Sequence, residues 1–253
     1  MKSRKYKIGC VLAVLAIMAG MLWAILSGFE DIALHPVSYI GYQRELNVYP
    51  DVGVDQEELN YVQYDVAQYL NGRDASLNNE RVIMFGVEQP IFNEREIAHM
   101  EDVKKLFELE RIMKNGAWLL ALTLGLFALL MTWAEGALWC GLYALGGWVL
   151  IALILGIACG FNFEAAFTKF HELLFDNDLW LLDPRTDAMI RMYPQAFFEK
   201  MAYSIGKRML TSAGYWWIIG SLSFMPWNKW KQWLEGIMEI EGKQNETNQN
   251  SGN

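Results

Sequence analysis

Two histidines in this chain have charged side chains at spacings that suit proton transfer. His99 has Arg95 four residues before it and Asp102 three residues after it, so a helix would place all three on one face. His171 is followed five residues later by Asp176. Because histidine exchanges protons near neutral pH, such pairs are typical of acid–base catalysis. The sequence therefore predicts a site built on two histidines and nearby carboxylates.

Other catalytic patterns were tested against the same residues and fail. The run from His171 to Phe175 has phenylalanine where a zinc protease needs its second histidine. Glu96 and His99 have the Glu-x-x-His spacing of di-iron bundles, but the matching position before His171 is Thr168. A zinc site made by the two histidines and one carboxylate stays open, since three protein ligands suffice for catalytic zinc.

The composition indicates a membrane protein with a polar part. Of 253 residues, 53% are hydrophobic and only 20% are charged, against about 25% charged in a soluble domain. Lys plus Arg number 21 and Asp plus Glu 29, a net charge of 21 − 29 = −8, so we expect no nucleic-acid partner. Three cysteines and three histidines exclude a disulfide-stapled domain or a multi-ligand metal cluster.

Four uncharged stretches predict four membrane spans. They cover residues 8–28, 117–133, 138–160 and 210–227, and about 20 apolar residues are enough to cross the hydrocarbon core. The four-residue linker 134–137 suits a cytoplasmic turn between two antiparallel helices. We therefore predict a mainly α fold, an integral membrane four-helix bundle.

The flanking charges predict the orientation. Lysine and arginine crowd residues 1–7, and Lys229 and Lys231 directly follow the last span, so both termini are expected in the cytoplasm. The tail 228–253 is polar towards its end and is expected to be partly disordered. Four spans then place residues 29–116 and 161–209 on the outer face. These two segments form an extracytoplasmic cap that is expected to be helical, with a short strand or hairpin in the Tyr- and Val-rich stretch 38–50.

Three helix boundaries can be placed in the cap. The apolar stripe over Glu57–Asn71 predicts a helix, and Asn93 with Glu96 three residues later predicts the start of another. Asp183 before Pro184 is typical of an N-cap and first helical residue.

The distance from His99 to the membrane adds a geometric expectation. His99 lies 18 residues before Ala117, so a straight helix rising ~1.5 Å per residue would put it roughly 27 Å above the second span. Because Asn and Gly end helices, we predict a break at 114–116, with the preceding helix lying along the membrane surface. This arrangement would bring His99 to His171.

Two long blocks carry a specific resemblance. FNEREIAHMEDVKKLF and FHELLFDNDLWLLDPRTDAMIRMYPQAFF resemble the lipoprotein intramolecular transacylase (Lit) family of Gram-positive bacteria. The resemblance implies a multi-pass protein of the bacterial cell membrane that moves the sn-2 acyl chain of a diacylglyceryl-modified lipoprotein to the α-amine of its N-terminal cysteine. It implies His99 and His171 as catalytic residues, membrane lipid and lipoproteins as partners, and no cofactor or metal. Orienting or substrate-binding roles are expected for Arg95, Asp102, Asp176, Trp180, Asp183, Arg185, Asp187 and Tyr193.

The residue types suit such a transfer. Neither block contains an evident Ser or Cys nucleophile, which favours direct attack of the amine on the ester over an acyl-enzyme. Asp102 is a candidate to orient His99, and Asp176 or Asp183 to orient His171. Two alternatives remain open, a membrane metal-dependent hydrolase and a non-enzymatic cap-bearing sensor or assembly protein.

Overall fold

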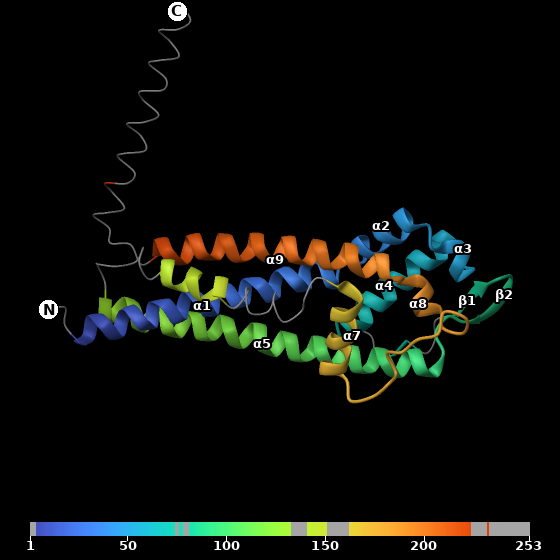
Figure 1. Ribbon diagram of the computed structural model, residues 1–253, viewed down its shortest axis with the longest axis horizontal. Helices are drawn as coiled ribbons and strands as arrows, with labels where there is room; N and C mark the ends of the chain where they lie inside the picture. Colours follow the sequence, from blue (N-terminus) through green and yellow to red (C-terminus); the bar gives the residue numbers. More distant parts are fainter. Residues whose placement is uncertain are drawn as a thin grey trace, which may run out of the picture. The chain divides into compact units, whose positions relative to one another are not determined.

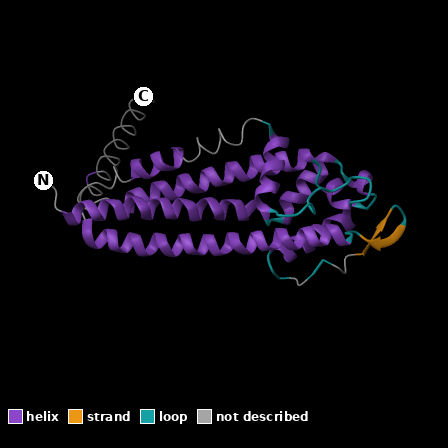
Figure 2. Ribbon diagram, turned by 60° about the horizontal axis from the view of Figure 1, so that its bottom comes forward, coloured by secondary structure: helices purple, strands orange, loops and turns teal. Residues whose placement is uncertain are grey.

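The computed structural model describes residues 4–73, 76–77, 81–132, 141–150, 162–223 and 232, and these are mostly helical (Figures 1 and 2). The prediction of a mainly α protein is thus confirmed. The chain forms two compact units, one made of residues 1–21, 117–150 and 214–253 and the other of residues 22–116 and 151–213. The predicted turn 134–137, parts of the third and fourth spans and, apart from residue 232, the tail 228–253 lie outside the described residues.

The first unit holds most of the residues that are predicted to cross the membrane. Among the described residues, two helices are long and apolar enough to do so by length and composition, Arg4–Ala33 (α1) and Glu94–Met131 within α5. A shorter apolar helix covers Gly141–Leu150. Helix α9 (Gln195–Ser223) contributes its last part, from Gly214 on, to this unit.

Indole groups and a glycine join the helices of the first unit. Trp148 Nε1 donates to the carbonyl of Met18 at 3.3 Å, and Trp217 Nε1 donates to that of Gly141 at 2.8 Å. A Cβ at Gly20 would lie 1.6 Å from the indole of Trp216, so only glycine permits this close approach of α1 to α9.

Three helices follow α1 in the second unit. Helix α2 covers Pro36–Leu46, α3 covers Tyr49–Val52 and α4 covers Gln56–Leu70. The strand or hairpin expected at 38–50 is therefore wrong, whereas the helix expected at Glu57–Asn71 is present. The apolar residues of 38–50 recur with a helical period, and those at positions 39, 42 and 46 all pack against one core.

Among the described residues, one hairpin does occur, later in the chain. Strands β1 (Arg81–Met84) and β2 (Val87–Pro90) pair antiparallel, with Val82 opposite Gln89 (Figure 2). The two turn residues, Phe85 and Gly86, have φ of 51° and 83°. Two successive positive φ angles are those of a type I′ turn, which matches the twist of the flanking strands.

Helix α5 runs without interruption from Glu94 to Thr132, as Figure 1 shows, so the predicted break at 114–116 is wrong. Side chains next to that point fix the helix to its neighbours. Lys114 forms an ion pair with Glu30, and Arg111 donates to the carbonyl oxygens of Leu70 and Asn71. Asn and Gly permit a helix to end but do not force it to, and continuing the helix satisfies every backbone group internally.

The second sequence block forms two short helices and the start of a long one. Helix α7 covers Phe163–Leu174 and α8 covers Ala188–Met192. The helix expected to start at Asp183-Pro184 therefore begins four residues later, with Asp187 as N-cap. Pro194 lies between α8 and α9.

The core of the second unit is formed by α2, α3, α4, the hairpin, the start of α5, α8 and the start of α9. Its fully buried side chains include Val52, Leu59, Val62, Met192 and Phe197. This core fixes α5 and α8 and so determines where the first turns of α5 lie.

Candidate functional site

The structure brings the two histidines together. His99 lies in the second turn of α5 and His171 in the last turn of α7, and their ring centroids are 6.3 Å apart with 34° between the ring planes. The two residues are only 7% and 9% exposed. Residues 72 positions apart in the chain thus form one buried pair.

Aromatic rings surround His171. Its centroid lies 4.1 Å from that of Phe167, 5.4 Å from that of Phe170 and 5.7 Å from that of Phe175. The indole of Trp180 stacks on it at 5.0 Å and 30°. We call Phe167, Phe170, Phe175 and Trp180 the aromatic cluster. Phenylalanine rings offer no hydrogen-bonding atoms, so the cluster makes an apolar setting for the imidazole.

The backbone of α7 fixes the tautomer of His171. Its Nδ1 lies 2.8 Å from the carbonyl oxygen of Phe167, one turn earlier. A carbonyl oxygen only accepts, so Nδ1 carries the hydrogen and Nε2 keeps its lone pair. Burial lowers the pKa of His171, while the hydrogen bond to Phe167 acts in the opposite direction. At neutral pH, His171 is therefore a neutral imidazole with a basic Nε2.

His99 is more strongly perturbed. Burial lowers its pKa to about 4, the nearby His171 acts in the same direction, and Asp102 partly opposes both. Within the part of the chain that the structure describes, Nδ1 of His99 is buried and has no hydrogen-bond partner. With its hydrogen on Nδ1, neutral His99 offers an N–H group for which the described residues supply no acceptor.

Arg95 holds the loop that follows α7. Its guanidinium donates to the carbonyl oxygens of Asp178 and, at 3.2 Å, of Leu181. These two carbonyls lie on either side of Trp180. The sequence placed Arg95 on the face of His99, and the structure shows that it contacts the Trp180 loop from that face.

Asp102 holds the same loop one turn beyond His99. Its Oδ2 accepts from Asn177 Nδ2 at 2.9 Å, and its Oδ1 accepts from Lys105 at 2.8 Å. Both contacts lower the pKa of Asp102, that to Lys105 more than that to Asn177. With both oxygens engaged, the carboxylate acts on His99 through charge and forms no hydrogen bond to it among the described contacts.

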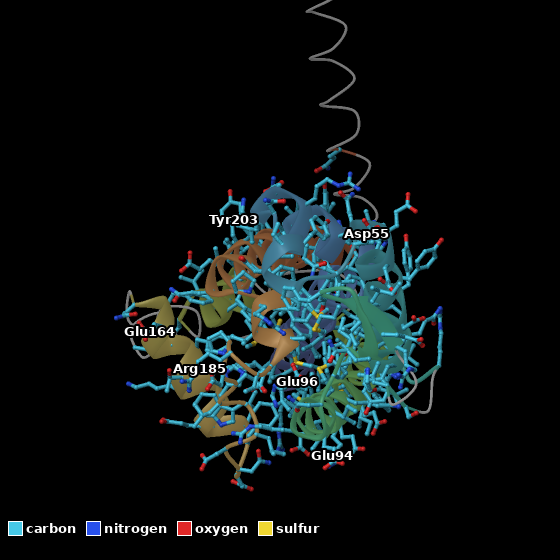
Figure 3. All side chains as sticks on the ribbon, turned by 90° about the vertical axis from the view of Figure 1, so that its right-hand side faces the viewer. Asp55, Glu94, Glu96, Glu164, Arg185 and Tyr203 are labelled. Atoms are coloured by element: carbon cyan, nitrogen blue, oxygen red, sulfur yellow. The ribbon has the colours of Figure 1, made fainter. Side chains whose placement is uncertain are left out.

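The buried carboxylate of Glu96 joins the two sequence blocks. Glu96 Oε2 accepts from the Asn93 backbone N–H at 2.8 Å, and its Oε1 accepts from that of Met189 at 2.6 Å. Burial raises the pKa of Glu96, although both backbone hydrogen bonds oppose this. In Figure 3, Glu94 lies at the outside while Glu96, 1% exposed, lies inside. The capping-box pattern predicted the contact between Glu96 and Asn93, but no sequence signal predicted the contact with Met189.

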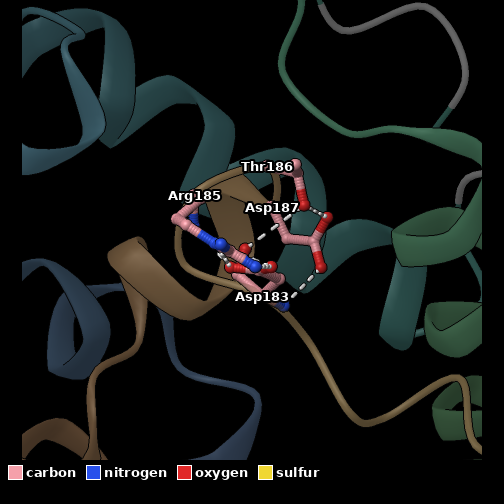
Figure 4. Close-up of polar contacts among 4 residues, drawn as sticks. All are labelled: Asp183, Arg185, Thr186 and Asp187. Atoms are coloured by element: carbon pink, nitrogen blue, oxygen red, sulfur yellow. Dashed lines mark hydrogen bonds and ion pairs between the residues drawn. The ribbon is translucent and has the colours of Figure 1, made fainter.

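Asp183, Arg185 and Asp187 form a compact turn in front of α8 (Figure 4). Arg185 pairs with Asp183 at 2.6 Å and lowers the pKa of that carboxyl to about 2. Asp187 accepts from the Asp183 backbone N–H at 2.7 Å and from Asn93 Nδ2 at 2.8 Å. The acids expected near His171 thus shape this turn, and the partner of Arg185 is Asp183, not Asp187.

Neither of the two remaining predicted residues bonds an imidazole among the described contacts. Tyr193 is buried in the core, donates to Gln63 at 2.6 Å, and has a pKa raised by that burial. Asp176 is exposed. Since Nδ1 of His171 bonds the Phe167 carbonyl, neither Asp176 nor Asp183 orients that ring by a hydrogen bond to Nδ1.

The zinc alternative was tested on the same geometry. Among the residues that the structure describes, no group of three or more His, Cys, Asp or Glu side chains is placed to hold a metal ion. The two histidines come together without a carboxylate as third ligand. The donor set therefore does not fit a three-ligand catalytic zinc site.

Comparisons with known proteins identify the fold. Residues 14–198 match the family model described as lipoprotein intramolecular transacylase Lit. The solved structure of the membrane-integral Lit from Bacillus cereus is 20% identical, with a TM-score of 0.69 over 86% of this chain and 96% of that one. A structure of that enzyme with one histidine replaced by arginine has a TM-score of 0.68, covering 86% and 92% at 21% identity. The corresponding alanine variant gives 0.67, covering 85% and 92% at 21% identity.

A relative from Aquifex aeolicus, described only as an uncharacterized protein, is 31% identical over 107 residues. The match covers 42% of this chain and 46% of that protein, so the chain spans less than half the length of this relative. Together with the solved structures, the family match confirms the predicted fold class, that of a membrane-integral helical protein.

Proposed function

The chain belongs to the lipoprotein intramolecular transacylase family, and on that premise we propose that it moves an acyl chain within a diacylglyceryl-modified lipoprotein. The sn-2 acyl group passes to the α-amino group of the N-terminal cysteine, which leaves a lyso-form lipoprotein. The observation that carries this proposal is the pairing of His99 and His171, 6.3 Å apart and enclosed by the aromatic cluster.

His171 is the base in this proposal. Its neutral Nε2 takes a proton from the attacking amine and returns it to the sn-2 oxygen as that oxygen leaves. The hydrogen bond from Nδ1 to Phe167 keeps the ring in the required tautomer, and the lowered pKa keeps it unprotonated at pH 7. A single imidazole can thus serve both proton transfers.

His99 is the hydrogen-bond donor to the ester carbonyl in this proposal. It is neutral at pH 7, because burial holds its pKa at about 4, and its buried N–H can donate to the ester carbonyl oxygen. Such a donor stabilises the negative charge that develops on this oxygen. The two histidines therefore divide the work, since one moves protons and the other stabilises charge.

Direct transfer needs little more than a folded substrate. The amine and the ester belong to one molecule, and holding them in contact can supply up to about 7–11 kcal/mol of the barrier. The aromatic cluster limits the access of water, which would otherwise hydrolyse the ester. No cofactor is required, since the substrate is its own acyl donor.

Exposed apolar side chains support a site at the membrane surface. Phe170 and Leu173 of α7 are 55% and 83% exposed, beside His171 in sequence, and Leu109 and Ile112 of α5 are 52% and 69% exposed, well before Ala117. If these side chains contact lipid, the membrane begins nearer to His99 than the sequence suggested. We propose four spans with both termini in the cytoplasm and residues 29–116 and 161–209 on the outer face.

The test is mass spectrometry of a synthetic dipalmitoylglyceryl-cysteinyl peptide incubated with the purified full-length protein in detergent. We expect one acyl chain to move to the cysteine nitrogen with no change in total mass, and we expect no such shift with His171→Ala. Loss of one fatty acid would instead indicate a lipase. Activity that a chelator abolishes would indicate a metal-dependent hydrolase. A peptide that stays unmodified would favour a non-enzymatic sensor or assembly protein.

A further inference from the structure

Trp180 carries a hydrogen-bond donor with no acceptor beside the proposed base. Its Nε1 is buried and, within the described part of the chain, has no hydrogen-bond partner, although its ring stacks on His171 at 5.0 Å. An indole N–H can only donate, and buried Trp N–H groups usually find a partner. An unsatisfied donor at such a place therefore calls for an acceptor that arrives with a ligand.

This N–H is chemically distinctive among the groups around His171. The three phenylalanines of the aromatic cluster contribute no polar side-chain atom, so its only side-chain hydrogen-bonding atom is Nε1 of Trp180. Unlike the nitrogens of the two histidines, it does not titrate in the working pH range. It therefore presents the same donor at every pH at which the protein functions.

The backbone on both sides of Trp180 is fixed. Arg95 binds the carbonyls of Asp178 and Leu181, and Asp102 binds Asn177. Arg95 and Asp102, which make these contacts, both lie on α5, one turn before and one turn after His99. The N–H is thus preorganised relative to both imidazoles, which is what a group that stabilises a transition state requires.

We propose that Trp180 is a further catalytic residue, whose indole N–H donates to the carbonyl oxygen of the acyl group as it is transferred; this role rests on the proposed function. The amine nitrogen bonds to the carbonyl carbon, the carbonyl electron pair moves to oxygen, and His171 takes the amine proton. Trp180 and His99 then donate to the oxyanion together. When the carbonyl re-forms, the C–O bond breaks and the sn-2 oxygen receives the proton from His171.

The test uses Trp180→Phe in the full-length protein with the dipalmitoylglyceryl-cysteinyl peptide as substrate. The variant keeps an aromatic ring against His171 but removes the donor. We expect kcat to fall by about 10²–10³-fold, as when one oxyanion donor is removed, with KM changed less than threefold. The control is Trp217→Phe, which removes an indole N–H bonded to Gly141 in the first unit and should leave kcat within twofold.

A second variant separates the donor from the shape of the ring. Replacing Trp180 by 3-benzothienylalanine keeps the bicyclic ring and substitutes sulfur for N–H, so it should lower kcat as much as Trp180→Phe does while preserving the melting temperature and the pH profile. Near-wild-type kcat in this variant would overturn the inference even if Trp180→Phe misfolds. If instead the wild-type protein shifts no acyl group, the proposed function itself fails.

Discussion

The imidazole rings of His99 and His171 face each other at 6.3 Å, one on α5 and one on α7, with no carboxylate hydrogen-bonded to either ring among the described contacts. This arrangement differs from a Ser-His-Asp triad, in which an acid orients the histidine. Here a backbone carbonyl orients His171, and the nearby acids hold the surrounding loop. The following predictions test this division of roles.

The two histidines should contribute separately, one as the base and the other as the oxyanion donor. We expect His99→Ala and His171→Ala each to lower kcat by about 10²–10⁴-fold, and the double variant to lose more activity than either single variant. Acyl shift measured by mass spectrometry checks this. His35→Ala is the matched control, because the side chain of His35 makes no capping hydrogen bond at the start of α2, and its activity should be unchanged. A double variant no worse than the poorer single variant would instead indicate that the two histidines act as one unit.

Asp102→Asn distinguishes two roles of Asp102, holding the Trp180 loop and orienting His99. The amide oxygen can still accept from Asn177 Nδ2, so the Trp180 loop should stay in place and kcat should fall less than threefold. An orienting carboxylate changed to an amide can cost about 10⁴-fold. A loss of that size would show that Asp102 acts on His99 directly, in contradiction to the contacts described above.

Glu96→Gln should destabilise the second unit. In the wild-type protein each Glu96 oxygen accepts from one backbone N–H group, that of Asn93 or that of Met189. Glutamine has an NH₂ group in place of one of these oxygens, so one of the two backbone N–H groups loses its acceptor. An unsatisfied buried donor costs about 1–3 kcal/mol. Denaturant titration in detergent measures the free energy of unfolding. Glu94→Gln, two residues earlier and exposed, should change this free energy by no more than about 0.5 kcal/mol. Equal effects of the two changes would mean that the contact with Met189 contributes nothing.

Gly116→Ala tests the continuity of α5. An added Cβ meets no atom within 4 Å, and alanine favours a helix interior by roughly 0.5–1 kcal/mol, so the protein should become more stable. Gly72→Ala is the contrasting change, because Gly72 has φ of 72° and alanine there is strained. The melting temperature should rise for the first and fall for the second. A fall for both would favour a helix that ends near Gly116.

Acid should destabilise the fold through His99. Its pKa is about 6.5 when unfolded but about 4 when folded, so the unfolded chain binds more protons in this interval. The free energy of unfolding should therefore decrease as the pH falls from about 6.5 to about 4, and change little from this cause below that. His99→Gln cannot take up the proton and should show a shallower slope. Parallel slopes for the two proteins would mean that His99 titrates normally.

The sequence alone determined the helical class, His99 and His171 as candidate reactive groups, and the face of α5 that carries Arg95, His99 and Asp102. These features depend on apolar content, residue type and a local period of 3.6 residues, all of which are properties of neighbouring positions. The capping box of Asn93 and Glu96 could be predicted for the same reason.

The tertiary structure decided the rest. The sequence could not show that Asp102 binds Asn177 and not His99, or that the second oxygen of Glu96 reaches Met189, because these partners lie 75 and 93 residues away. It also misplaced the end of the helix at Asn115-Gly116, where ion pairs and hydrogen bonds from Lys114 and Arg111 to α1 and α4 outweigh a weak local preference. Local propensities differ by about 1 kcal/mol or less, so a few long-range contacts are enough to override them.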